Sequence, residues 1–177
     1  MHELRDANDA RRMVDFWADV GATSFKAYMH ITLADLRAAS AEAHRRGVKI
    51  TGHLCSVTYR DAAAAGIDDV EHGFFVATDF DPGKRPDVRP GQIAGMTSVA
   101  ALDTNNAVFR SLVAELVAHP VTLTSTLTAF ETFVSGQSPP PGLVVLDPIL
   151  RDRYESFAPR WSERRARCSR RCSQGRG

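Results

Sequence analysis

The feature that most constrains the fold is a recurring unit: a helical stretch, a glycine, then a β-rich run. The glycines are Gly21, Gly47 and Gly66, and the runs that follow them are ATSFKAYM, VKITGHL and IDDVEHG. Glycine often ends a helix because it adopts the left-handed backbone conformation without strain. Helices that alternate with strands in this way predict βαβ units and a parallel sheet.

The helical stretches carry recognisable start signals. A first helix capped by Asp9 has its apolar positions at helical spacing, namely Met13, Phe16, Trp17 and Val20. Thr32 and Asp35 form a capping-box-like pair for a second helix, and Ser56 or Thr58 begins a short third one. Further along the chain, we expect a helix capped by Thr104, a fourth strand, VTLTSTL, and a last helix over residues 147–157.

This order of elements fits two parallel α/β folds, an open doubly wound sheet and a (β/α)8 barrel. Right-handed crossovers place a helix after each strand in both. No Gly-x-Gly-x-x-Gly and no phosphate loop follows any strand, which weakens the nucleotide-binding version. Four strands make half a barrel. We therefore expect an α/β fold that is a partial (β/α)8 TIM barrel.

Composition indicates an ordinary globular chain with an unusual end. Apolar residues make up 44% of the 177 residues, and no apolar run approaches the roughly 18 residues of a membrane span. The polar N-terminus has no secretion signal, so the expected compartment is the cytoplasm. Three cysteines, an odd number, argue against a disulfide framework. Residues 78–95 are rich in proline, glycine and charge, which predicts a long loop.

The last residues, 159–177, hold seven arginines against one acidic residue, a net charge of +6 that leaves −5 for the rest. We expect this stretch to be a disordered tail. It could contact RNA or a membrane surface, but it lacks the interleaved aromatic residues and the fold of a nucleic-acid module. The expected partner is a small-molecule substrate, with no nucleic acid and no membrane.

Three residues occupy comparable places on the predicted strands and could do chemistry together. Lys26 lies on the first strand, which the alternation predicts to be buried, and His53 and His72 end the second and third. In barrels the carboxyl ends of the strands build the active site. Two imidazoles there could bind a zinc-like metal. An ammonium cannot join them, but a neutral lysine that has reacted with CO₂ becomes a carbamate, which can.

The segments GATSFKAYMH, GVKITGHL and AAAAGIDDVEHG resemble the amidohydrolase superfamily, especially its imidazolonepropionase- and prolidase-like branch. AGIDDVEHG is the most specific of them. The resemblance covers about residues 8–158 and implies strands 4 to 7 of a (β/α)8 barrel. It also implies a metal-dependent hydrolase of amide-like C–N bonds, acting on a cyclic amide or a dipeptide-like substrate.

Carried over by motif, the resemblance makes CO₂-modified Lys26 the ligand that bridges two metals, with His53 and His72 as metal ligands. One or two divalent ions, by default Zn²⁺, are implied as the cofactor. Because side chains alternate along a strand, we expect Glu71 to face away from His72 and to support the site indirectly. His30 follows the lysine strand and could line the substrate pocket, although an exposed loop position is the simpler expectation.

The chain also departs from the family pattern. The His-x-His of strand 1 is absent, and so is the strand-8 aspartate that serves as general base, so no catalytic residue is assigned. The stretch APRWSERRARCSRRCSQGRG resembles a GC-rich gene read in the wrong frame. We expect a fragment, cut at the front and frameshifted at the end.

Two other readings of the same residues stay open. Lys26 could be the Schiff-base lysine of an aldolase-like barrel. Alternatively, the chain catalyses nothing, because half a barrel has two open sheet edges that invite pairing with another chain or aggregation. Pairing through those edges would make the protein a homo-oligomer.

Overall fold

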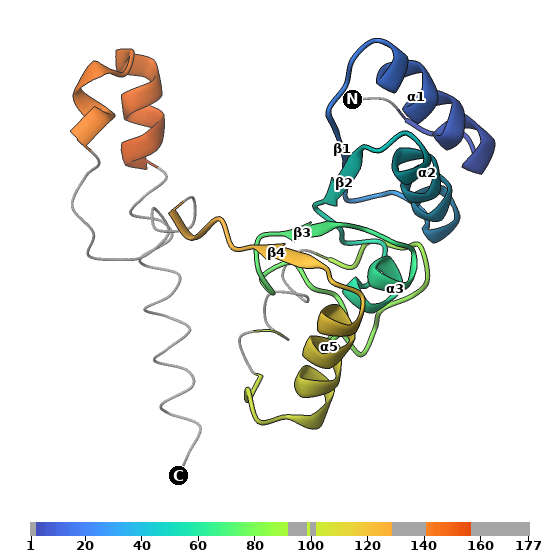
Figure 1. Cartoon of the computed structure of the whole chain (residues 1–177). Helices are drawn as coiled ribbons and strands as arrows, with labels where there is room; N and C mark the ends of the chain where they lie inside the picture. Colours follow the sequence, from blue (N-terminus) through green and yellow to red (C-terminus); the bar gives the residue numbers. More distant parts are fainter. Residues whose placement is uncertain (1–2, 92–98, 100–101, 129–140, 157–177) are drawn as a thin grey trace. The chain divides into compact units, whose positions relative to one another are not determined.

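The computed structural model describes residues 3–91, 99, 102–128 and 141–156 of the chain (Figure 1). The chain divides into two compact units, Met1–Ser125 and Thr126–Gly177. The predicted boundary between a barrel at 1–158 and a tail at 159–177 lies outside the described residues.

The described residues of the first unit form four α-helices with defined caps: α1 (Ala7–Asp19), α2 (Leu33–Arg45), α3 (Tyr59–Ala64) and α5 (Ala107–Ala118). The side chains of Thr32 and Thr58 accept hydrogen bonds from the backbone N–H three residues on, which confirms the caps expected for α2 and α3.

Two predicted caps are wrong by a few residues. Asp6, not Asp9, caps α1, and Asn106, not Thr104, caps α5. Asp9 is instead a buried carboxylate in the first turn of α1, paired with Arg5 and Arg12. Any Asp, Asn, Ser or Thr near a helix start can serve as the cap, and tertiary contacts choose among neighbours.

The strands form one parallel sheet in the order β1-β2-β3-β4. They are β1 (Ser24–Ala27), β2 (Lys49–Gly52), β3 (Asp69–Glu71) and β4 (Thr122–Thr124), each shorter than its predicted run. Lys26 pairs in register with Thr51, Thr51 with Asp69, and Glu71 with Thr124. These partners point to the same face of the sheet.

All four helices lie on one side of this sheet and follow one another in chain order (Figure 1). A doubly wound sheet reverses its strand order and places helices on both faces. A sequential parallel order with helices on one face is compatible with a partial barrel. The four strands do not close on themselves within the described part of the chain.

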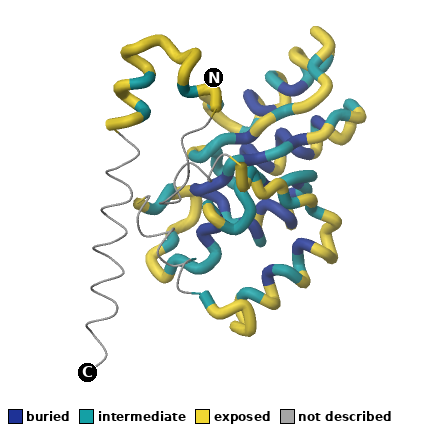
Figure 2. Tube along the Cα trace, turned by 90° about the vertical axis from the view of Figure 1, so that its left-hand side faces the viewer, coloured by how far each residue is buried: buried dark blue, intermediate teal, exposed yellow. Residues whose placement is uncertain are grey.

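The two faces of the sheet differ in chemistry. The face toward the helices is apolar, and its residues join the main core: Phe25, Ile50, Val70 and Leu123 from the strands, with Leu36, Tyr59, Leu112 and Leu116 from the helices. The opposite face carries Lys26, Thr51, Asp69, Glu71 and Thr124. Figure 2 shows the buried stretches gathered in this first unit.

In the second unit, a short 3₁₀ helix, Pro141–Val145, precedes helical residues 148–156. The latter confirms the last predicted helix as far as the description reaches. No helix in the described ranges combines the length and hydropathy that crossing a bilayer requires.

Candidate metal site

The three residues singled out in the sequence lie at one end of the first unit's sheet. Lys26 is in β1, His53 directly follows β2, and His72 directly follows β3. The backbone N–H of His53 donates to the carbonyl of Ala27, which continues the parallel pairing of β1 and β2 past the end of β2. The carboxyl ends of neighbouring parallel strands thus bring these residues together.

The two histidine rings contact each other directly. Nε2 of His72 lies 3.0 Å from Nδ1 of His53, and the ring centroids are 4.5 Å apart at an interplanar angle of 73°. The ring of Tyr28 packs edge-on against His53, with the two ring centroids 5.1 Å apart. The facing nitrogens of the two imidazoles therefore share a hydrogen bond at the mouth of the sheet, so one of them carries the proton and the other accepts it.

Lys26 reaches the histidines through Glu71. Its Nζ lies 2.6 Å from Oε2 of Glu71, and the same oxygen lies 3.7 Å from Nε2 of His72. The prediction that Lys26 is buried is wrong, because 49% of its side chain is exposed. Lys26 lies on the polar face of the sheet, which none of the described helices of the first unit covers.

The prediction that Glu71 faces away from His72 is also wrong. Strict alternation would direct His72 toward the helix side of the sheet, as it does the neighbouring Val70. However, His72 has φ of 70°, in the left-handed region, where alternation no longer holds. The turn of the backbone brings the His72 ring to the same face as Glu71.

A buried tyrosine braces this unusual backbone. The hydroxyl of Tyr59 lies 2.8 Å from the carbonyl oxygens of both Glu71 and Gly73, the residues on either side of His72, and shares its one proton between them. Gly73 N–H also donates to the carbonyl of Thr124 at 2.9 Å. These contacts offset the cost of a left-handed non-glycine residue, which is about 1–2 kcal/mol.

Hydroxyl groups complete the polar face. Thr51 Oγ1 lies 3.1 Å from Oε1 of Glu71 and 2.8 Å from Oδ2 of Asp69. Thr124 donates to the second oxygen of Asp69 at 2.9 Å. Glu71 therefore keeps one oxygen for Lys26 and the other for Thr51, which holds its carboxylate in one orientation.

The site keeps both histidines neutral near pH 7. Burial, together with the charges of His72 and Lys26, lowers the pKa of His53 to about 4. Burial also lowers the pKa of His72, although the carboxylate of Glu71 opposes this effect. Burial raises the pKa of Glu71, but the hydrogen bond and positive charge of Lys26 outweigh it and leave that pKa below its usual value. Neutral imidazoles have the lone pairs that metal binding requires.

The histidine nitrogens, which share a hydrogen bond here, lie near the spacing that two nitrogens on one zinc ion have. A tetrahedral Zn²⁺ at the usual Zn–N distance separates two such nitrogens by about 3.3 Å, close to the 3.0 Å found between His53 and His72. Among the described residues, no group of three or more His, Cys, Asp or Glu side chains is arranged to hold a metal. The donors available at this point are thus the two imidazoles, with Lys26 and Glu71 beside them.

The loop after β3 folds back over the ends of the other strands. Lys84 Nζ donates to the carbonyl of Ser56 at 2.5 Å, and the backbone N–H of Leu33 donates to Asp87 at 2.6 Å. The charge of Arg89 acts on His53 and Cys55. The predicted loop is confirmed up to residue 91, and its remainder, 92–95, lies outside the described residues.

Sequence reasoning overlooked Tyr59 and Thr51 and misjudged Glu71. One signal was present: polar residues at every second position in Thr51–His53 and Asp69–Glu71 mark a polar sheet face. The role of Tyr59 had no local signal, since Tyr59 lies in α3 and its partners lie in β3 and just after it. His30 is exposed, as the simpler expectation held.

Comparison with known proteins identifies no family for this chain. No family model matches it, and no curated protein matches it either. One similar solved structure is a Xaa-Pro dipeptidase with bound methionine in its active site, at 14% identity and a TM-score of 0.47, over 90% of this chain and 34% of that one. Another is an uncharacterised protein, at 15% identity and a TM-score of 0.38, over 73% of this chain and 41% of that one. The chain thus spans well under half the length of either protein.

Proposed function

We propose that this chain carries the metal-binding part of a hydrolase that cleaves amide-like C–N bonds in a small molecule, either a cyclic amide or a dipeptide-like compound. The observation that carries the proposal is the pair of neutral imidazoles, His53 and His72, whose nitrogens lie 3.0 Å apart at the carboxyl end of a parallel sheet. The resemblance of AGIDDVEHG to amidohydrolases supports the same assignment.

In this proposal each residue has a distinct task. His53 and His72 would hold a divalent cation, Zn²⁺ by default, in place of the proton that lies between their facing nitrogens. Lys26 supplies oxygen ligands once it has reacted with CO₂, which first requires release from Glu71 and loss of its proton. A bound cation would polarise the substrate carbonyl and make a water more acidic. We assign no general base among the described residues, so the decisive test is metal binding rather than turnover.

The test compares metal content and Co²⁺ absorption spectra of the full chain with those of His53→Ala and His72→Ala. We expect about one ion or more per wild-type chain and a loss of affinity of at least tenfold in each variant. His30→Ala is the matched control, because His30 is an exposed histidine with no hydrogen bond to the described residues. Equal metal binding by wild type and both variants would refute the proposal.

A second candidate function, Schiff-base chemistry at Lys26, is favoured by the exposure of that side chain. A half-exposed lysine amine 2.6 Å from a carboxylate is open to a carbonyl substrate and has a proton acceptor beside it. Its nitrogen would form a Schiff base with loss of water. Borohydride reduction in the presence of a small aldehyde or ketone should then add the carbonyl fragment to Lys26 and not to a Lys26→Arg variant. Absence of that adduct in a metal-loaded wild-type protein favours the hydrolase.

A further inference from the structure

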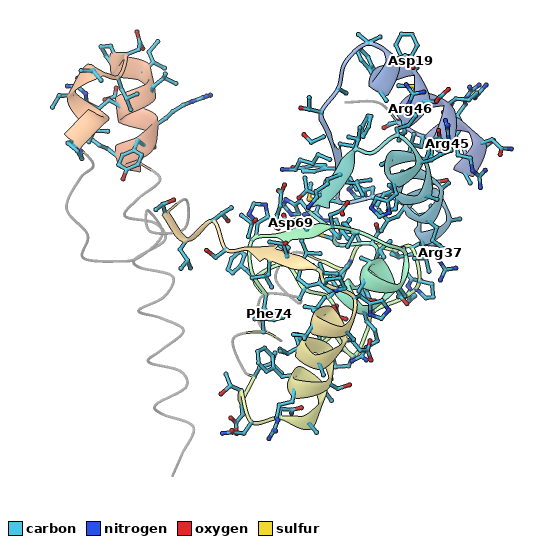
Figure 3. The ribbon with its side chains drawn as sticks, in the orientation of Figure 1. Asp19, Arg37, Arg45, Arg46, Asp69 and Phe74 are labelled. Carbon is cyan, nitrogen blue, oxygen red and sulfur yellow. The ribbon has the colours of Figure 1, made fainter. Side chains whose placement is uncertain are left out.

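Helix α1, the first helix of the layer, has an apolar flank that none of the described residues covers. Helix α1 buries Ala10 and Val14, and its Asp15 forms ion pairs with Arg45 of α2 and with Arg46, the C-cap of α2. Asp19 pairs with Arg46 as well, and Figure 3 labels these two residues. The other flank carries an apolar stripe, which we call the α1 stripe: Met13, Phe16, Trp17 and Val20. Phe16, Trp17 and Val20 are 56%, 47% and 63% exposed, so the stripe that predicted this helix is not in the core.

Helix α5, the last helix of the layer, also has an exposed apolar flank, on the side of the helix away from α3. Helix α5 buries Leu112 and Leu116, while Glu115 pairs with Arg60 of α3. By helical spacing, Val113 and Val117 lie on the flank away from Glu115, and Val117 is 75% exposed.

The sheet is open at the same two ends. Within the described residues, β1 pairs only with β2, and β4 only with β3, so each presents one unpaired backbone edge. Helix α1 precedes β1 and packs on α2, so its stripe lies at the β1 end of the layer. Helix α5 precedes β4 and packs on α3, so its free flank lies at the β4 end. An open edge and an apolar helix flank therefore coincide at both ends.

We propose that two copies of this chain join edge to edge, with β4 of each copy beside β1 of the other, in one ring of eight parallel strands. Three observations fit a second copy. The strand order β1-β2-β3-β4 continues without reversal into another β1. Each α1 stripe would meet the Val113 and Val117 flank of the other copy's α5. Four strands from each of two copies equal the eight that close the common α/β barrel, and a two-fold axis closes the assembly.

Closure would also enclose the polar face of the sheet. Lys26, Thr51 and Glu71 would then face the interior of the ring, and the two histidine pairs would share one mouth. The proposal does not depend on metal binding, because it rests on the helix flanks and the sheet edges alone.

The experiment measures the mass of the full chain by size-exclusion chromatography with light scattering over a wide range of protein concentration. We expect about twice the chain mass of 19.4 kDa. Trp17→Glu and Val117→Glu each place a charge in the proposed contact, so each should raise the dimer dissociation constant by roughly a hundredfold. Val108→Glu is the control, since Val108 is an exposed apolar residue of α5 on the flank that carries Glu115.

Circular dichroism should show the same helix content in all variants, because the substituted side chains are exposed in the single chain. If Trp17→Glu loses structure, Val20→Glu tests the same stripe. A wild-type monomer overturns the proposal. Open-ended assemblies larger than a dimer, or a dimer that survives Trp17→Glu or Val117→Glu, also overturn it.

Discussion

The Nζ atom of Lys26 lies 2.6 Å from Oε2 of Glu71, although the two residues belong to β1 and β3, which β2 separates. Two strand spacings amount to roughly 10 Å, so both long side chains must extend across the sheet. They pass over Thr51 of β2, which binds the other oxygen of Glu71. The pair therefore sets a positive and a negative charge beside the two histidines.

Replacing Glu71 with Gln should lower the pKa of His72. The Glu71 carboxylate raises that pKa by its negative charge, and the amide removes the charge while keeping the shape. NMR titration of the imidazole nitrogens measures the change. Asp69→Asn is the matched control, because Asp69 lies on the same face and binds Thr51 and Thr124 instead. A higher His72 pKa in Glu71→Gln would contradict the arrangement. The free energy of unfolding of Glu71→Gln should fall by about 1 kcal/mol or less, since its ion-pair partner Lys26 is half exposed and solvent weakens such a pair.

Stability should fall with acidification in a window set by His53. The unfolded chain takes up a proton on this histidine near pH 6.5, whereas the folded chain does so only near pH 4. Between these values the unfolded state binds more protons, so the free energy of unfolding rises with pH. The contribution of His53 is therefore complete above about pH 6.5 and is lost progressively as the pH falls to about 4.

Urea denaturation of wild type and His53→Gln at several pH values measures this contribution. Titrating carboxylates are common to both proteins and cancel in the difference. The wild type should lose more stability than His53→Gln over the window. Parallel pH profiles for the two proteins would show that His53 is not held neutral by the fold.

Tyr59→Phe should destabilise the first unit by about 1–3 kcal/mol, because it removes the only side-chain donor in the described residues to the carbonyls of Glu71 and Gly73. It should also shift the NMR resonances of His72, whose backbone those carbonyls flank. Tyr28→Phe is the control, since the Tyr28 hydroxyl has no hydrogen-bond partner among the described residues. We expect that control to change stability by less than about 0.5 kcal/mol. Equal effects of the two substitutions would argue against bracing by Tyr59.

His72→Gly should be more stable than His72→Ala, the reverse of the usual order for these two residues. At φ of 70° an alanine keeps the left-handed penalty and a glycine does not. The expected difference in the free energy of unfolding is about 1 kcal/mol, measured by urea denaturation. Ala63→Gly in α3 serves as the reference with ordinary helical geometry, and there glycine should cost about 1 kcal/mol. A less stable His72→Gly would mean that this residue is not held in the left-handed conformation.

Local sequence patterns predicted most of the helices and strands and part of the candidate metal site. The spacing of apolar residues and the Thr32 and Thr58 caps predicted helices that the structure contains. The motif around Lys26, His53 and His72 predicted residues that meet at one end of the sheet. The burial of Lys26, the orientation of Glu71 and the burial of the α1 stripe could not be obtained in this way, because each depends on which surfaces another element covers.

The sequence by itself determined where helices and strands form, since caps, glycines and side-chain periodicity act over a few residues. It also determined that one strand face is polar, through alternate residues in β2 and β3. Only the tertiary structure decided that His72 turns toward His53 and Glu71. That turn requires a left-handed backbone, and the hydroxyl of Tyr59 and the carbonyl of Thr124, which hold it, come from α3 and β4.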